Sequence, residues 1–223
     1  MLFLEKKVFL ANTVPLNLER ILKYLFVMLN MMESILDDII SLHKAKKWEA
    51  ILKLRNEHCD HLSALKILWV WPSTTNLTFL KNVMWNYNMK GVISLGCGCG
   101  LLEWIIEQAT GYPAIGYEIN EEWWESKYSN PQFIPLKYAE KEKPVLHSAY
   151  ALLFCYFNDG SAFRDYIKSY KGRMVIIIGP GEGSGRHADP LPFSAEFGES
   201  NWKIFQHQEV RDTKDFIAIY LRK

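Results

Sequence analysis

The chain has 223 residues, of which 49% are hydrophobic, and it contains 8 Trp, 11 Tyr and 12 Phe. This supply of apolar side chains suffices for one sizeable core, which excludes an intrinsically disordered protein. The 26 basic and 25 acidic residues nearly cancel to a net charge of +1. Such a balance does not support a general attraction to nucleic acid or to an anionic membrane.

The cysteines suggest neither a disulfide framework nor a metal site. Cys59, Cys97, Cys99 and Cys155 show no paired spacing, so we expect reduced thiols in an intracellular, cytoplasmic protein. Zinc would need two more ligands beside Cys97 and Cys99. The other candidate cluster, His-Cys-Asp-His at residues 58–61, lacks the usual spacing, so we expect no metal.

No stretch of the chain predicts a membrane segment. Residues 1–4 are apolar, but Glu-Lys-Lys follows at once and no cleavage site follows an adequate apolar core, which argues against a signal peptide. The most hydrophobic later window, residues 24–32, is too short to cross a bilayer. We therefore expect a soluble protein without a membrane partner.

Residues 1–72 predict a helical N-terminal extension. Apolar residues recur at helical spacing from about residue 16 to residue 42, and again over residues 46–70. These stripes require an apolar neighbour but do not identify it. The helices either cover one side of the following domain, cap its active site, or meet a protein partner, including a second copy of the chain.

Residues 69–76 break the helical pattern and predict a hinge to a second domain, residues 73–223. Trp69 and Trp71 in this hinge either anchor the extension to the core or stack on the ring of an adenine or a substrate. Thr75 or Asn76 is expected to cap a helix over residues 77–87, which leads into the first strand.

Residues 91–120 predict a β-α-β unit. The run Val-Ile-Ser-Leu at residues 92–95 fits a strand buried on both faces. Gly96, Gly98 and Gly100 follow at alternate positions, and apolar residues then recur at helical spacing, so the glycines lie on a strand-to-helix turn. Without a Cβ, glycine lets the main chain pass close to a ligand.

The same unit supplies polar groups for a nucleotide-type ligand. The second apolar run, residues 114–117, ends in Glu118, whose carboxylate suits the two hydroxyls of a ribose. The free N–H groups at the start of the helix favour a negative group such as a carboxylate. The alternative is a tight structural turn with a solvated glutamate.

The spacing of the glycines distinguishes between cofactors. A dinucleotide fingerprint has its third glycine one position later, where this chain has Leu101. G-x-G-x-G followed by a strand that ends in Glu resembles the first two motifs of the class I S-adenosylmethionine-dependent methyltransferases. The resemblance implies S-adenosylmethionine as cofactor. The cofactor-binding residues that we predict are Gly96, Cys97, Gly98, Gly100, Glu118, Ile119 and Cys155.

Two further segments follow before the centre of the sheet. Residues 120–124 predict a helix start with acids in its first turn. Residues 133–136 predict a short third strand, and its proline indicates that the strand is brief or lies at an edge. In the resembled family, the loop after this strand helps to hold the adenine, often through an acid. Glu140 and Glu142 are candidates, but their Lys/Glu run is typical of a solvated surface.

Residues 150–157 predict a central fourth strand, because they are apolar without alternation. Ligands of open α/β sheets bind beyond the carboxyl ends of the strands, so residues 155–159 should face the reactive methyl. The amino-methylating subgroups of the family have Asp/Asn-Pro-Pro-Tyr/Phe here. This chain has neither proline, which argues against adenine or glutamine N-methylation. Tyr156 and Asn158 either orient a substrate or belong to the core and a turn.

After a helix at residues 162–170 and a buried strand at residues 173–178, the chain has four glycines and two prolines within residues 179–190. This loop is either an ordinary crossover or a lid that contacts the substrate. Its polar side chains are Glu182, Arg186 and His187.

Residues 202–210 and 215–221 predict an antiparallel hairpin, which the methyltransferase family adds to a parallel sheet and plain dinucleotide folds lack. The expected fold is therefore α/β. It is a doubly wound, mostly parallel seven-stranded sheet with a C-terminal antiparallel hairpin, preceded by the helical N-terminal extension. The resemblance implies that residues 73–223 form the Rossmann-like methyltransferase domain.

The resemblance implies a soluble transferase that moves the sulfonium methyl of S-adenosylmethionine to a small-molecule or protein substrate by in-line displacement. Such enzymes mainly align the reactants, so no catalytic residue is identified from the sequence. The alternatives are a catalytically inactive relative that acts as a cofactor sensor or a protein-interaction scaffold, and a dehydrogenase.

Overall fold

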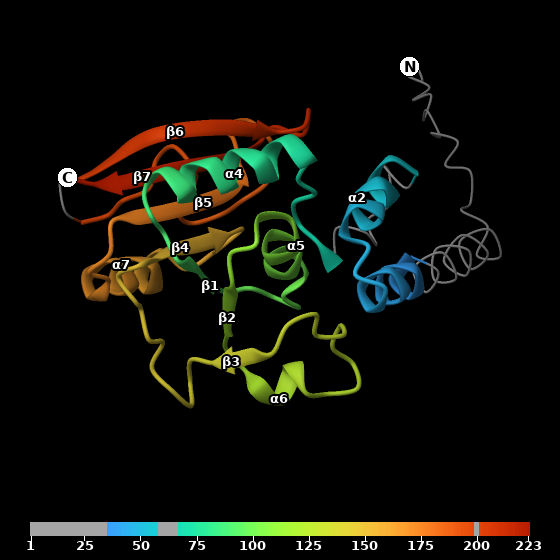
Figure 1. The fold of residues 1–223 in the computed structure, drawn as a ribbon. Helices are drawn as coiled ribbons and strands as arrows, with labels where there is room; N and C mark the ends of the chain where they lie inside the picture. The colour runs from blue at the N-terminus through green and yellow to red at the C-terminus, as the bar shows by residue number, and fades with distance from the viewer. Residues whose placement is uncertain (1–34, 58–66, 199–200) are drawn as a thin grey trace, which may run out of the picture.

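The structure is a computed structural model that describes residues 35–57, 67–198 and 201–223. A seven-stranded sheet in the order β3-β2-β1-β4-β5-β7-β6 forms its centre (Figure 1). Residues 35–44 are helical. The further elements are α2 (Trp48–Glu57), α4 (Thr74–Asn86), β1 (Gly91–Leu95), α5 (Leu101–Thr110), β2 (Ala114–Glu118), α6 (Glu121–Trp124), β3 (Leu136–Tyr138), β4 (Tyr150–Cys155), α7 (Gly160–Ser169), β5 (Met174–Pro180), β6 (Trp202–Val210) and β7 (Asp215–Arg222).

The sheet topology confirms the predicted fold class. Strands β3, β2, β1, β4 and β5 pair in parallel. Their order is that of a doubly wound sheet. The chain adds strands from β1 towards β3 on one side, and then from β4 towards β5 on the other, so the order switches between β1 and β4. Strand β7 pairs antiparallel with β5, and β6 pairs antiparallel with β7. The C-terminal hairpin thus extends the parallel sheet at one edge.

The central strands are apolar throughout because helices cover both faces of the sheet. Every residue of β1 and β5 is buried. Neighbouring residues of β1 point to opposite faces. Val92 packs in the cluster that includes α4 and α5, whereas Ile93 packs in the cluster that includes Phe163 and Ile167 of α7.

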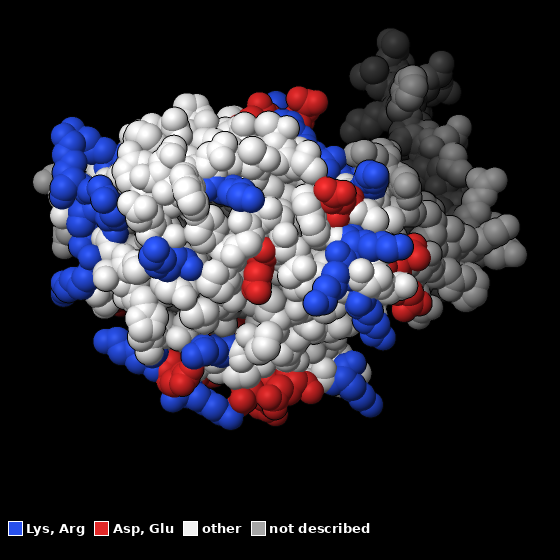
Figure 2. Space-filling view, viewed as in Figure 1, with Lys and Arg blue, Asp and Glu red and all other residues white. Residues whose placement is uncertain are grey.

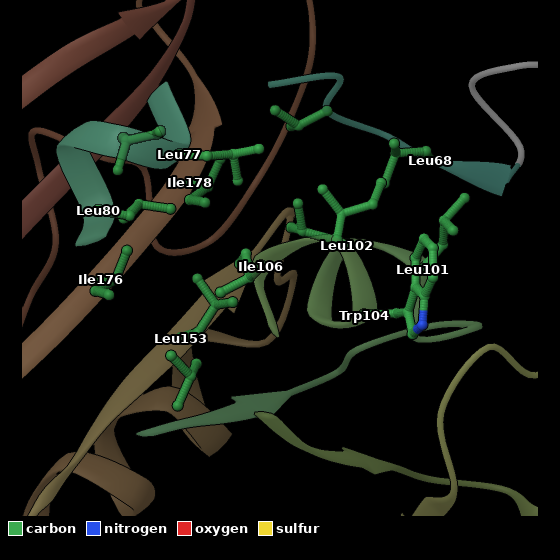
Figure 3. Close-up of a cluster of buried hydrophobic side chains, with 14 of the residues drawn as sticks. Leu68, Leu77, Leu80, Leu101, Leu102, Trp104, Ile106, Leu153, Ile176 and Ile178 are labelled. Carbon is green, nitrogen blue, oxygen red and sulfur yellow. The ribbon is translucent and has the colours of Figure 1, made fainter. Parts of the chain in front are cut away.

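Figure 3 shows the first of these clusters at the contact between helices and sheet. Leu77 and Leu80 of α4 and Ile106 of α5 lie over Ile176 and Leu153 of the strands. All are buried hydrophobic side chains. This packing fixes α5, and therefore the turn in front of it, against the sheet.

The described part of the N-terminal extension covers α5. Ile39 and Ile51 are fully buried in the same cluster as the residues of α4 and α5, and α2 packs against α5. Arg211 in the β6–β7 turn donates to the carbonyl oxygens of Leu52 at 3.1 Å and Pro72 at 3.3 Å. The part of the predicted first helix before residue 35 lies outside the described residues.

Two local predictions were wrong in detail. Helix α4 is capped by Ser73 and not by Thr75 or Asn76, because Ser73 and Asn76 form a capping box in which each side chain accepts from the other's backbone N–H. The third strand lies at Leu136–Tyr138, not at residues 133–136. Pro135 cannot donate to a ladder, and the strand begins directly after it.

Charges are mixed on the surface that Figure 2 displays. Acidic and basic side chains both occur around α6 and β3, at the bottom of the view. None of the helices in the described ranges combines the length and the hydropathy that a membrane span requires.

Candidate functional site

A cavity of about 250 Å³ lies at the carboxyl ends of β1, β2 and β4. Its wall combines the glycine turn, the first turn of α5, the tips of β2 and β4, and the segment before α4. The lining residues are Ile67, Leu68, Trp69, Gly96, Cys97, Gly98, Cys99, Leu101, Leu102, Glu103, Glu118, Trp124, Asn130, Cys155 and Tyr156. This is where a doubly wound sheet binds its ligands.

The glycines of the turn serve two different purposes. Gly98 has a φ of +61°, and a Cβ built on it would meet no atom nearer than Trp124 at 4.0 Å. Both residues line the cavity, so Gly98 leaves open space beside the main chain. At Gly100, with a φ of +76°, a Cβ would lie only 2.4 Å from Cγ1 of Ile134. Gly100 therefore permits packing under the turn.

Glu118 at the tip of β2 holds the glycine turn. Its Oε1 accepts from the N–H of Gly98 at 2.6 Å, and its Oε2 accepts from the N–H of Ile119 at 3.1 Å. Each carboxylate oxygen retains a further acceptor position, so the residue can still receive hydroxyl groups of a ligand.

Glu118 also lines a second cavity of about 250 Å³. Both cavities include Gly96 and Glu118 in their walls. The second is lined by Gly96, Tyr117, Glu118, Ile119, Ala139, Phe157, Asn158, Asp159, Ala162 and Tyr166. A ligand with two ends could thus lie across Glu118, with one end in each cavity.

Glu103 is a polar residue of the cavity that the sequence reasoning missed. It lies in the first turn of α5 and is only 1% exposed. Its Oε1 accepts from the hydroxyl of Ser94 at 2.6 Å, while its buried Oε2 has no hydrogen-bond partner in the described part of the chain. An unsatisfied buried carboxylate oxygen is costly and calls for an explanation.

The surroundings of Glu103 disfavour its charge. Burial raises its pKa from 4.5 to about 7, and the negative charge of Glu118 acts in the same direction, while the hydrogen bond from Ser94 opposes them. The signal in the sequence was an acid within the apolar run Leu-Leu-Glu-Trp-Ile-Ile, together with a serine in a fully buried strand.

The cysteines at the cavity are neutral thiols. Cys97, Cys99 and Cys155 are free, and burial raises the pKa of each, to about 12 for Cys99 and well above the usual range for the other two. No group of three or more potential metal ligands occurs among the residues that the structure describes. Residues 58–61, including Cys59, lie outside them.

An aromatic and charged network borders the cavity where β4 ends and β7 begins. The ring of Trp69 stacks on that of Tyr156, with centroids 5.5 Å apart. The Tyr156 hydroxyl donates to the buried Asp215 at 2.6 Å, and Arg186 donates to the other oxygen of Asp215 at 3.0 Å. Burial, followed by the hydrogen bond to Asp215, raises the pKa of Tyr156, so its phenol is a donor at neutral pH.

The two hinge tryptophans have different roles. Trp71 is buried in the core, whereas Trp69 is 57% exposed and lines the cavity. Trp71 therefore anchors the hinge. Trp69 packs on the Tyr156 ring of the core, and its stacking on a ligand stays a prediction.

The structure brings most of the predicted site residues together. Of the predicted cofactor-binding residues, those that line the first cavity are Gly96, Cys97, Gly98, Glu118 and Cys155. Ile119 lines the second cavity, and Gly100 supports the turn from behind. Their role in cofactor binding stays a prediction. Of the other candidates, Glu140 accepts from the N–H of Asn120 at 3.3 Å, and Glu142 pairs with Lys137 at 3.5 Å.

No protein-family model and no curated protein matches the chain. Similar solved structures include the magnesium protoporphyrin IX methyltransferase (ChlM) from Synechocystis PCC 6803 with bound SAM, at 14% identity and a TM-score of 0.43 over 67% of this chain and 79% of that one. The O-methyltransferase from Bacillus cereus in complex with SAH has 13% identity and a TM-score of 0.46, over 85% of this chain and 91% of that one.

Human N-acetylserotonin methyltransferase (ASMT) in complex with SAM is also similar, at 15% identity and a TM-score of 0.46, over 72% of this chain and 54% of that one. Likeness at this level carries no information about substrate. The fold is established by the strand order and the antiparallel hairpin of this chain itself. By that topology, the chain has the fold that its resemblance to the class I methyltransferases predicted.

Proposed function

We propose that the chain binds S-adenosylmethionine at the carboxyl ends of β1, β2 and β4 and transfers its methyl group to a small-molecule or protein substrate. The observation that carries this proposal is the chemistry of the first cavity. It contains the carboxylates of Glu103 and Glu118 and the rings of Trp69, Trp124 and Tyr156. Acids and aromatic faces attract cations, and the sulfonium cofactor is one.

The same composition argues against a dinucleotide. Within the described chain, no Lys, Arg or His lines this cavity. A pyrophosphate carries negative charge, and two carboxylates beside it would repel it. The dehydrogenase alternative is therefore disfavoured by charge as well as by the position of Leu101.

The residues present fit the parts of the cofactor. The open space beside Gly98 admits a ligand against the main chain, and Glu118, which lines both cavities, suits the ribose hydroxyls. The second cavity offers Ile119 and Phe157 as apolar walls for the adenine ring. The first cavity then receives the amino-acid end. When bound, the cofactor supplies an electrophilic methyl group on a good leaving group.

The chain's own residues would align the acceptor and exclude water. Trp69 and Tyr156 line the cavity beside the tip of β4, where the acceptor would approach. Tyr156 is held as a phenol by Asp215, and the Cys155 thiol is neutral. Neither is suited to act as a base at neutral pH. We infer an acceptor atom that is nucleophilic without deprotonation by these two residues.

Titration calorimetry with S-adenosylmethionine, S-adenosylhomocysteine and NAD tests the cofactor. We expect both adenosyl compounds to bind and NAD not to bind. Absence of binding by the adenosyl compounds at millimolar concentration would sink the proposal.

Methyl transfer needs a separate experiment. Cofactor labelled in its methyl group is incubated with the protein and a cell extract, and the label is then sought in the small-molecule and protein fractions. Label in either fraction identifies the acceptor class. Cofactor binding without transfer would instead support the sensor alternative.

A further inference from the structure

We propose that Glu103 receives the ammonium group of the amino-acid end of the cofactor. This assignment rests on the proposed function, and it concerns a residue that the glycine motif does not include. Its basis is the buried, half-satisfied carboxylate in the wall of the cavity.

The carboxylate of Glu103 is positioned but incompletely used. Ser94 on β1 holds Oε1 at 2.6 Å, and α5 is fixed against the sheet by the hydrophobic cluster around Ile105. Oε2 is buried and finds no donor among residues 35–57, 67–198 and 201–223. A rigidly held acceptor without a donor is matched by a ligand that brings one.

The two thiols of the glycine turn donate elsewhere. The thiol of Cys99 donates to the carbonyl of Ile67 at 3.2 Å, and that of Cys97 lies 3.8 Å from the carbonyl of Gly98. Thiols are in any case weak donors. Among the described lining residues there is no cationic side chain to pair with Glu103. A cation must therefore come from the ligand.

The groups around Glu103 make the binding of an ammonium group to its carboxylate sensitive to pH. Burial and the charge of Glu118 on β2 raise its pKa, and the hydrogen bond from Ser94 on β1 lowers it. The charge of Glu103 in turn raises the pKa of the thiols that face it, Cys97 and Cys99 in the turn and Cys155 on β4. Without a cation the pKa of Glu103 is about 7. An ammonium group beside it favours the ionised form, so binding below pH 7 should release a proton.

A comparison of two ligands with two proteins isolates this contact. S-adenosylhomocysteine carries the amino-acid end, and 5′-methylthioadenosine lacks it. We expect Glu103→Gln to lower the affinity for S-adenosylhomocysteine by about tenfold or more. The affinity for 5′-methylthioadenosine should change by less than about twofold, because only the first ligand brings the ammonium group. Glu107→Gln, one turn further along α5, is the matched control and should change neither affinity.

Two further measurements address the charge itself. The affinity of the parent for S-adenosylhomocysteine should fall between pH 8 and pH 6 more steeply than that of Glu103→Gln. Titrations at pH 6.5 in two buffers of different ionisation enthalpy should show proton release for the parent only. Ser94→Ala keeps the carboxylate but removes the hydrogen bond that favours its charge, so the fall in affinity should move to higher pH.

The outcomes separate this assignment from the proposed function. If the parent binds both ligands and Glu103→Gln binds S-adenosylhomocysteine equally well, the assignment to Glu103 is wrong while cofactor binding stands. Equal losses for both ligands would mean a structural role and would also overturn it. If the parent binds neither ligand, the proposed function itself fails. Circular dichroism of each variant verifies that it is folded.

Discussion

The tip of β2 and the first turn of α5 each direct one glutamate to the same cavity, yet the chain treats the two carboxylates differently. Glu118 accepts from two backbone N–H groups. Glu103 accepts from one hydroxyl and keeps a buried oxygen without a partner in the described residues. The first carboxylate organises the protein's own turn. The second is costly to the free protein, and a ligand would relieve that cost.

Glu103→Gln should produce the largest effect, on stability. Because the folded-state pKa is raised from 4.5 to about 7, the ionised form opposes folding, and stability is lost as the pH rises through this range. A rise of the pKa from 4.5 to about 7 lowers the free energy of unfolding at pH 8 by about 3 kcal/mol. The variant carries no such charge, so its free energy of unfolding at pH 8 should exceed the parent's by up to that amount.

Urea denaturation of both proteins at pH 5 and pH 8 measures this difference. The gain should largely disappear at pH 5, where the parent's Glu103 is protonated. A variant that is less stable than the parent at pH 8 would show that the charge of Glu103 is already compensated in the free protein. The contrast with Glu118 would then be lost.

Gly98→Arg should abolish cofactor binding, with a loss of at least about 100-fold, or about 2.7 kcal/mol. The open space beside Gly98 would be filled by the side chain, and the turn would lose the geometry that Glu118 holds. Calorimetry measures the loss, and circular dichroism checks that the fold is retained. Gly98→Ala is the control, because it has the same positive φ but little bulk. Parent-like affinity of the arginine variant would refute the site.

Glu118→Ala should lower the affinity for the cofactor by about tenfold, because the variant loses a charge-assisted contact to the ribose and the carboxylate that holds Gly98. Since this role does not involve the amino-acid end, S-adenosylhomocysteine and 5′-methylthioadenosine should lose affinity alike. That pattern differs from the one expected for Glu103→Gln, and calorimetry with both ligands distinguishes them. A loss restricted to S-adenosylhomocysteine would mean that the two glutamates have been assigned the wrong way round.

Tyr156→Phe should have the smallest effect, a loss of about 1 kcal/mol of stability. Asp215 loses one donor but keeps Arg186 and the hydroxyl of Thr213. Affinity for S-adenosylhomocysteine should stay unchanged, because the carboxylates of the cavity are untouched. Thermal denaturation and calorimetry test the two parts. A marked fall in affinity would mean that the hydroxyl of Tyr156 itself contacts the cofactor.

The elements around the glycine turn were predictable because their signals are local. An apolar run such as residues 92–95 must be a buried strand, and the glycines must end it. The hairpin was equally plain from two strand-like runs joined by a short polar turn. Prediction was less accurate where several neighbouring residues could cap the same helix. Ser73 rather than Thr75 caps α4, because Ser73 forms a capping box with Asn76, three residues further along.

The two carboxylates differ in how far local sequence patterns could identify them. The acid at the tip of a strand was identified at residue 118 because its spacing from Gly98 is a pattern in one dimension. Glu103 lies in an apolar helix, and its meaning depends on Ser94 across the helix–sheet contact, on the depth of burial and on the charge of Glu118. Periodicity and turn chemistry thus sufficed for the elements and their order. Burial, pKa and the pairing of polar atoms are properties of the packed chain, because they depend on contacts between segments that no local pattern encodes.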